Sequence, residues 1–352
     1  MDMHPTLPAH RIRFPAHVVI RASSLCASNA PSTASTICSK ALGGSAVLPT
    51  FPLCEATTWR PAHQESPSTP RRNNPPSETK SKSISITEDS NASLFFVGTA
   101  TTILEWEGLR LMTDPNFLHA GDHVHLGPGV TATRRTDPAV DLEDLPPIDL
   151  VLLSHYHADH FDQRVEAELR RDLPIITTPH AHKHLAHKPA GEAFTSVQAL
   201  DAWDDMFVDV ASKTAPTPGR PPRLHVTGMP GKHVGDGLLA KANDILGAVP
   251  PTNGWMLELG YTDDTSGGDH DAFHCGYRIY ISGDTLYVHE LERIPELYTH
   301  AGKPIDLMLV HLGGTTIPGP HLPLMMVTMD AEQGLKLVQL VKPEVTIPIH
   351  YE

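Results

Sequence analysis

The sequence contains a dense group of potential metal ligands shortly before its midpoint. His155, His157, Asp159 and His160 lie within six positions, directly after Ser154. Neutral imidazole rings and carboxylates are ligands that zinc and similar divalent metals take in proteins. The chain is rich in histidine, with 23 in 352 residues, but composition alone does not place such a group directly after an apolar segment. We therefore predict a metal site here.

The apolar residues at 150–153 predict a strand that is buried on both faces. Alternate side chains of an extended chain point the same way, so His155 and His157 can converge on one point. Asp159 and His160 follow where the chain turns toward a helix predicted over 162–171. The end of a buried strand therefore positions this group of ligands.

Further acidic or histidine side chains each follow a predicted apolar strand. They are Asp114 after 109–112, His233 after 223–227, Asp284 after 277–282, His311 after 306–310 and His350 after 345–349. Strands and helices that alternate from residue 93 onward predict a layered α/β or α+β domain. In such a domain, strand ends that are distant in the sequence can meet along one edge of a sheet.

Two other histidine-containing segments are weaker candidates. A helix predicted over 179–187 places His180, His184 and His187 on one face, but no acid or buried strand accompanies them, which favours a surface helix. The long segment 116–147 contains no convincing element, and it is either a flap that contacts substrate or a solvated polar loop. Its histidines and arginines are His119, His123, His125, Arg134 and Arg135.

The composition excludes several classes of function. The formal net charge is −14, and the excess acid lies after residue 80, which argues against broad binding to nucleic acid. No apolar run approaches the ~18 residues of a transmembrane helix. The 4 cysteines form neither a disulfide framework nor a metal-binding spacing, which favours a reducing compartment and a cytoplasmic location.

Residues 1–80 are rich in Pro, Ser and Thr and show no lasting period. Such a composition cannot bury much apolar surface, so we predict a disordered extension before a single domain over 93–352. The segment contains Arg and Ser and few acids, which also fits an organelle transit peptide and makes a mitochondrial location the alternative. A mispredicted gene start would look the same.

The His-x-His-x-Asp-His cluster after an apolar strand resembles the signature of the metallo-β-lactamase superfamily. The resemblance covers about residues 93–350 and includes weaker segments in the same order. These are Thr113-Asp114-Pro115, Gly231-Lys232-His233, Gly283-Asp284 and Ile349-His350. The resemblance implies a four-layer αββα sandwich.

The same resemblance implies a site for two metal ions. One ion would be held by His155, His157 and His233, the other by Asp159, His160 and His350. Asp284 would bridge the two, together with a water or hydroxide. Asp114 would lie beneath the site and orient the ligand loops without binding metal. A donor set without thiolate suits Zn²⁺, and also Mn²⁺ or Fe²⁺.

The implied activity is hydrolysis, because two close cations bring the pKa of a shared water toward neutrality. Asp159 would also steer the attacking water. His311 would donate a proton to the leaving group, position another residue, or be a buried neutral histidine bonded to backbone. An Asp at 284, where some antibiotic-hydrolysing members have Cys, disfavours a true β-lactamase, and His157 disfavours the His-x-Glu-x-Asp form of diiron members.

The order of the segments looks most like the branch with ascorbate-6-phosphate lactonases and N-acylphosphatidylethanolamine phospholipases D. That branch implies a small-molecule or lipid-like substrate with a phosphodiester or a lactone/ester bond.

In one respect the sequence departs from the superfamily: only Tyr351 and Glu352 follow His350. Strand ends with nothing beyond them fray, so we expect weak binding of the second metal in a truncated gene product. One alternative is therefore a metal-binding but catalytically impaired homologue. A separate alternative is a nuclease of the same fold.

Overall fold

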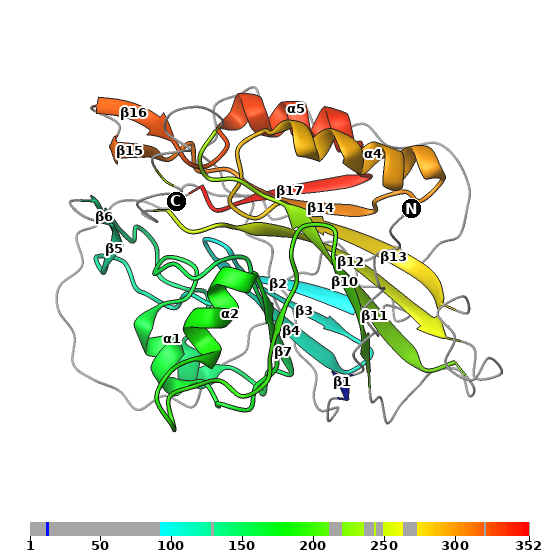
Figure 1. Ribbon diagram of the computed structural model, residues 1–352, viewed down its shortest axis with the longest axis horizontal. Helices are drawn as coiled ribbons and strands as arrows, with labels where there is room; N and C mark the ends of the chain where they lie inside the picture. The colour runs from blue at the N-terminus through cyan, green and yellow to red at the C-terminus, as the bar shows by residue number, and fades with distance from the viewer. Residues whose placement is uncertain are drawn as a thin grey trace, which may run out of the picture.

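Two β-sheets lie face to face, and helices cover their outer faces (Figure 1). The computed structural model describes residues 12–13, 92–127, 130–210, 220–235, 243, 249–262, 273–319 and 322–351. One sheet has the strand order β2-β3-β4-β7-β8-β9 and the other β1-β10-β11-β12-β13-β14-β17. This arrangement confirms the predicted αββα sandwich.

The first sheet provides the strand that precedes the ligand cluster. Its members are β2 (Ala92–Gly98), β3 (Thr101–Trp106), β4 (Leu109–Thr113), β7 (Leu150–Leu153), β8 (Ile175–Thr177) and β9 (Val197–Ala199). Strands β4, β7, β8 and β9 run parallel. In β7, Leu150 and Leu152 pack in the core between the sheets, whereas Val151 and Leu153 pack toward the helices. Burial on both faces explains the uninterrupted apolar run.

The second sheet brings the later strand ends to the same region. Its members are β1 (Ile12–Arg13), β10 (Asp205–Asp209), β11 (Pro222–Pro230), β12 (Asn253–Thr262), β13 (Phe273–Ile281), β14 (Leu307–His311) and β17 (Val345–Ile349). Strands β13, β14 and β17 pair in parallel. The residues that follow β13 and β17, and the last residue of β14, therefore lie at one edge.

Helices form the two outer layers, and side chains cap α1, α2 and α5. Helices α1 (Gln163–Glu168) and α2 (Pro179–Ala186) cover the first sheet, and α4 (Arg293–Leu297) and α5 (Ala331–Val341) cover the second (Figure 1). Asp162 caps α1 by accepting from the backbone N–H groups of Arg164 and Val165. Short 3₁₀ helices also occur, namely η1 (Leu142–Asp144), η4 (His289–Glu292) and η5 (Thr299–Ala301).

The structure corrects some of the predicted elements. The segment 116–147 contains a hairpin, β5 (His123–Gly127) and β6 (Val130–Thr133), where no element was expected. The helix predicted over 162–171 ends earlier, because Leu169 is extended. A second hairpin, β15 (Thr316–Gly319) and β16 (Leu322–Met326), was also not predicted, since prolines within it argue against strands. Helix α4 was missed as well.

Two further predictions concern the ends of the chain and the membrane. The predicted disordered extension over 1–80 falls outside the described residues, except for β1, which pairs with β10. Within the part of the chain that the structure describes, no helix is long and apolar enough to span a bilayer.

A cluster of charges lies on the second sheet, away from the ligand cluster. His225 contacts two carboxylates, with its Nε2 2.8 Å from Asp205 Oδ2 and its Nδ1 2.7 Å from Glu258 Oε2. Arg278 Nε donates to Glu258 Oε1 at 2.7 Å. Burial opposes a charged imidazole, but the hydrogen bonds to the two carboxylates outweigh it and raise the pKa of His225 to about 9. Burial also opposes the charge of Glu258, but His225 and Arg278 lower its pKa to about 2.

We expect this cluster to make stability depend on pH in the alkaline range. The folded pKa of His225 lies above its unfolded value of about 6.5, so its contribution is complete below pH 6.5 and is lost as the pH rises through 9. Between these limits the free energy of unfolding should fall by about 1.5–3 kcal/mol, the range for hydrogen bonds to charged groups.

Urea unfolding from pH 6 to 10 measures this fall. The variant His225→Gln should lose most of the decline, whereas His300→Gln, a change at an exposed histidine, should keep it. An equally steep decline in both variants would show that His225 does not carry the effect.

Candidate metal centre

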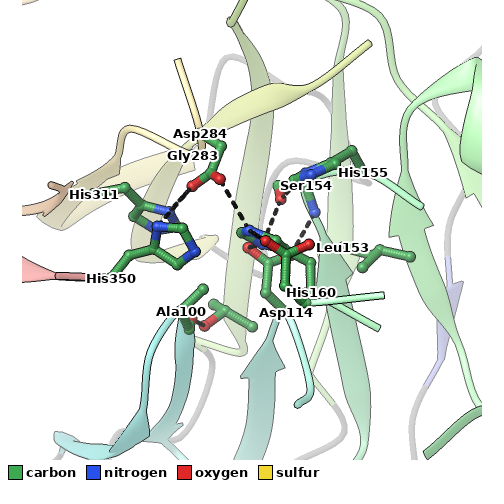
Figure 2. Close-up of polar contacts among 12 residues, drawn as sticks. Ala100, Asp114, Leu153, Ser154, His155, His160, Gly283, Asp284, His311 and His350 are labelled. Atoms are coloured by element: carbon green, nitrogen blue, oxygen red, sulfur yellow. Dashed lines mark hydrogen bonds and ion pairs between the residues drawn. The ribbon is translucent and has the colours of Figure 1, made fainter. Parts of the chain in front are cut away.

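Histidine and aspartate side chains from both sheets converge at one edge of the sandwich (Figure 2). The structure contains groups whose ligand atoms lie within 4.8 Å of one another, and these groups share members. They are Asp159, His160, Asp284 and His350; His155, His157 and Asp159; and His155, His233 and Asp284. All the predicted donors are therefore brought together, and Asp284 belongs to two of the groups.

The grouping differs in one respect from the predicted assignment. Asp159, His160 and His350 lie together, as expected for one metal. Among the described residues, however, no group contains His155, His157 and His233 at once. The reason is local, because His157 Nδ1 lies 2.6 Å from Asp159 Oδ1 and its ring is engaged at that carboxylate.

Tight turns after the strands present the donors of the cluster. After β7, the backbone N–H groups of His160 and Phe161 both donate to the carbonyl of His157. After β13, Gly283 adopts a left-handed conformation with φ +62°, and a Cβ there would collide with the carbonyl oxygen of Asn253. Only glycine fits this turn, and the turn delivers Asp284 to the site.

Asp284 lies between donors of the two sheets (Figure 2). Its Oδ2 lies 3.1 Å from His160 Nε2, which belongs to the first sheet. Its Oδ1 lies 2.9 Å from His311 Nδ1 and 3.3 Å from His350 Nδ1, both from the second sheet. The residue is 2% exposed, and its ion-pair partners among the described residues are these three histidines.

Asp114, at the end of β4, holds the ligand segment from beneath. Its Oδ1 accepts from the backbone N–H of Ser154 at 2.6 Å, and its Oδ2 lies 3.1 Å from His160 Nδ1. The residue has φ +35°, a conformation that Asp tolerates better than most residues. Each ring nitrogen of His160 therefore faces a carboxylate.

The cluster carries an excess of negative charge. Among the described residues, the ion-pair partners of Asp114, Asp159 and Asp284 are all histidines. Burial opposes the charge of Asp284, but His350 and His160 hold its pKa well below the usual value. Burial likewise opposes a charged His160, but Asp284, Asp114 and Asp159 raise its pKa well above the usual value. A proton on His160 thus balances charge that a metal ion could balance instead.

The donor chemistry fits a divalent metal. His233 Nδ1 lies 3.0 Å from the carbonyl oxygen of Val327, which can only accept, so this nitrogen carries the proton. The lone pair is then on Nε2, which lies 3.2 Å from His155 Nε2. Burial lowers the pKa of His155 and of His233, so both rings are neutral. Two neutral imidazole rings next to the carboxylate of Asp284 are a set of side chains that commonly binds divalent metals.

His311 contacts Asp284 through one of its two ring nitrogens. A carboxylate only accepts, so His311 donates from Nδ1 to Asp284. Its Nε2 is buried and has no hydrogen-bond partner within the described residues. Its backbone N–H donates to Ser282 Oγ at 2.9 Å. This arrangement can transfer a proton through Nε2 while Nδ1 holds the ring.

Some contacts of the site were not predicted from the sequence. Ser154 Oγ lies 2.9 Å from His155 Nδ1, and Thr99 accepts the backbone N–H of His350 at 2.9 Å. Arg134, one of the side chains of the segment 116–147, donates to Thr99 Oγ1 at 2.7 Å. The contact of Ser154 could have been predicted, because Ser154 directly precedes the cluster in the sequence. The contact of His233 with the backbone carbonyl of Val327 could not, because any residue type has such a carbonyl.

The chain matches a known family and several known proteins. The model of the family described as "Beta-lactamase superfamily domain" matches residues 109–351. A UPF0173 metal-dependent hydrolase of Nanoarchaeum equitans is 24% identical over 213 residues, which cover 60% of this chain and 73% of that protein. The yeast Saccharomyces cerevisiae has a mitochondrial N-acyl-phosphatidylethanolamine-hydrolyzing phospholipase D that is 26% identical over 220 residues, covering 62% of this chain and 39% of that protein.

Solved structures share the fold. An isothiocyanate hydrolase from Delia radicum gut bacteria superposes with a TM-score of 0.53 at 19% identity, over 73% of this chain and 84% of that one. A possible metal-dependent hydrolase from Veillonella parvula gives a TM-score of 0.52 at 16% identity, over 72% of this chain and 83% of that one. At these identities the likeness concerns the fold alone.

We expect Asp114→Asn to weaken metal binding at the group that contains His160. The amide nitrogen cannot accept a hydrogen bond, so one of the contacts to Ser154 and His160 is lost. Loss of such an orienting partner typically costs 10–100-fold in metal affinity or activity. Competition with a chelator, followed by elemental analysis, measures the loss.

Asp162→Asn is the matched control for this variant. Asp162 is also buried next to the cluster, but it accepts from the backbone of Phe117 and from the first turn of α1. This change should lower stability and leave metal affinity unchanged. Equal metal retention in both variants would show that Asp114 does not position a ligand.

Proposed function

The chain belongs to the metallo-β-lactamase superfamily and is a metal-dependent hydrolase, and we propose that it uses two metal ions to cleave a phosphodiester or a lactone/ester. The observation that carries this proposal is the position of Asp284. It completes one group with His155 and His233 and another with His160 and His350. A carboxylate shared in this way supports two neighbouring cations.

The nitrogen and oxygen donors suit Zn²⁺, and Mn²⁺ or Fe²⁺ would fit the same set. When bound, two such ions would supply Lewis-acid activation of water near neutral pH and stabilise negative charge that develops on the substrate. Asp114 fixes His160 from one side, and Asp284 fixes it from the other. The ring therefore has little freedom to leave its position.

Asp159 and His311 have different roles in this proposal, which are to orient the attacking water and to donate a proton. The Asp159 side chain is 25% exposed, and its pKa is lowered by His160 and His157 against the effect of burial. It remains ionised, so it can orient an attacking water through a hydrogen bond. His311 donates from Nδ1 to Asp284, and once its Nε2 has taken up a proton from solvent it can pass that proton to the leaving oxygen and keep the one on Nδ1.

Several observations bear on the substrate. The yeast relative is named as a phospholipase D, which supports a phosphodiester. The net charge of −14 disfavours a nuclease. The proposal of an impaired homologue supposed that His350 is poorly held, but its backbone bonds to Thr99 and its ring stacks on His311 with centroids 5.4 Å apart. We therefore favour an active enzyme for a small-molecule or lipid-like substrate.

We expect Asp284→Asn to lower hydrolysis by at least about 100-fold, because the amide cannot serve both metal positions. Turnover of an activated phosphodiester with added Zn²⁺ or Mn²⁺, together with metal content per chain, measures the effect. The control is Asp306→Asn, since Asp306 accepts from the backbone N–H of Arg278 on the same sheet and, among the described residues, which include all donors of the cluster, has no hydrogen bond or ion pair with those donors. Turnover retained in Asp284→Asn would remove the shared role of this carboxylate.

We expect His311→Asn to separate proton donation from metal binding. The amide nitrogen of Asn can replace the Nδ1 donor to Asp284, but nothing replaces Nε2. Metal content should stay at the wild-type level, and kcat should fall about 100-fold or more for a substrate with a poorly acidic alcohol leaving group.

With a p-nitrophenolate leaving group, which departs without a proton, the loss in His311→Asn should be much smaller. Equal losses with both substrates would assign His311 a positioning role and not proton donation.

A further inference from the structure

A pair of histidines on α2 forms a second group of potential ligands, outside the cluster described above. His180 and His184 lie one helical turn apart, and their Nε2 atoms are 3.3 Å from each other. The ring centroids are 4.6 Å apart, with an interplanar angle of 52°. The two Nε2 atoms thus lie next to each other on the surface of the helix.

The separation of these nitrogens matches a tetrahedral metal site. Zinc–nitrogen bonds are about 2.0–2.1 Å long, and a tetrahedral angle then places two ligand nitrogens about 3.3 Å apart. The observed Nε2–Nε2 distance is 3.3 Å. The i, i+4 spacing of two histidines on one helix face is itself a zinc-binding arrangement.

The His184 ring packs against an aromatic side chain that is itself held by hydrogen bonds. The His184 ring stacks on Tyr156 with centroids 5.0 Å apart and an interplanar angle of 3°. The Tyr156 hydroxyl donates to the carboxylate of Glu166, which also pairs with Lys188. An ordered ring loses less conformational entropy when it binds an ion.

The two ring nitrogens of His180 differ in their surroundings. Its Nδ1 is buried and has no hydrogen-bond partner among the described residues. A proton on this Nδ1 leaves the lone pair on Nε2, toward His184.

We propose that His180 and His184 form an additional site for a divalent transition metal such as Zn²⁺, with the remaining positions taken by water. The contact between the two Nε2 atoms is replaced by two metal–nitrogen bonds, and each ring then carries its proton on Nδ1. Glu166 is engaged by Tyr156 and Lys188 and supplies no ligand. With two protein ligands, the ion binds more weakly than one in the main cluster and exchanges readily.

A titration of the full chain with Zn²⁺ tests this site. The wild type should bind one more equivalent than His184→Ala and His180→Gln, which each remove one ligand. His182→Ala is the matched control, because His182 lies on the same helix and contacts the ring of His187 at a centroid distance of 6.0 Å, away from the pair. This control should bind as many equivalents as the wild type. The same number of equivalents in all four proteins would overturn the proposal.

A second readout separates this site from the main cluster. With Co²⁺ in place of Zn²⁺, the difference spectrum between wild type and His184→Ala should show the intense visible absorption of a tetrahedral ion. The same difference should persist in an Asp284→Asn background, whether or not that variant hydrolyses any substrate. A weak octahedral spectrum would identify adventitious surface binding and overturn the assignment.

Discussion

The buried carboxylate of Asp284 is the constraint on which the rest of the arrangement depends. It contacts His160 from the first sheet and His311 and His350 from the second. A charge buried between two sheets is tolerated only when it is paired and hydrogen-bonded. The sheets must therefore meet with these strand ends aligned, and the parallel pairing of β13, β14 and β17 provides that alignment.

The same edge of the sandwich concentrates more negative charge than its histidines balance. Among the described residues, the ion-pair partners of Asp114, Asp159 and Asp284 are all histidines. The elevated pKa of His160 shows how the protein alone meets this excess, by retaining a proton. Because a metal ion would take over that role and bind the folded state, metal binding and stability are thermodynamically linked in this protein.

Precise backbone conformations support the cluster from outside. Asp114 and His350, with φ +35° and +60°, both adopt left-handed conformations that non-glycine residues rarely take. Such conformations persist only where surrounding contacts hold them. Here the backbone N–H of Asp114 donates to the carbonyl of Leu152, and that of His350 donates to the carbonyl of Thr99. The Thr99 hydroxyl in turn accepts a hydrogen bond from Arg134. The contacts around the donors thus extend from β4 to the hairpin formed by β5 and β6.

The layered fold and the positions of the candidate donors in the chain can be predicted from the sequence alone. Those features follow from local rules, since each donor comes directly after an apolar strand, and a strand such as β7 shows its burial in its residue types. The grouping of the donors became clear only in the folded structure. There His157 contacts Asp159, and Asp284 belongs to groups with donors from both sheets. The tertiary structure also decided the hairpin β5–β6 and the contact of His233 with the carbonyl of Val327. These features depend on backbone atoms and on partners distant in the chain, which the types of neighbouring residues do not encode.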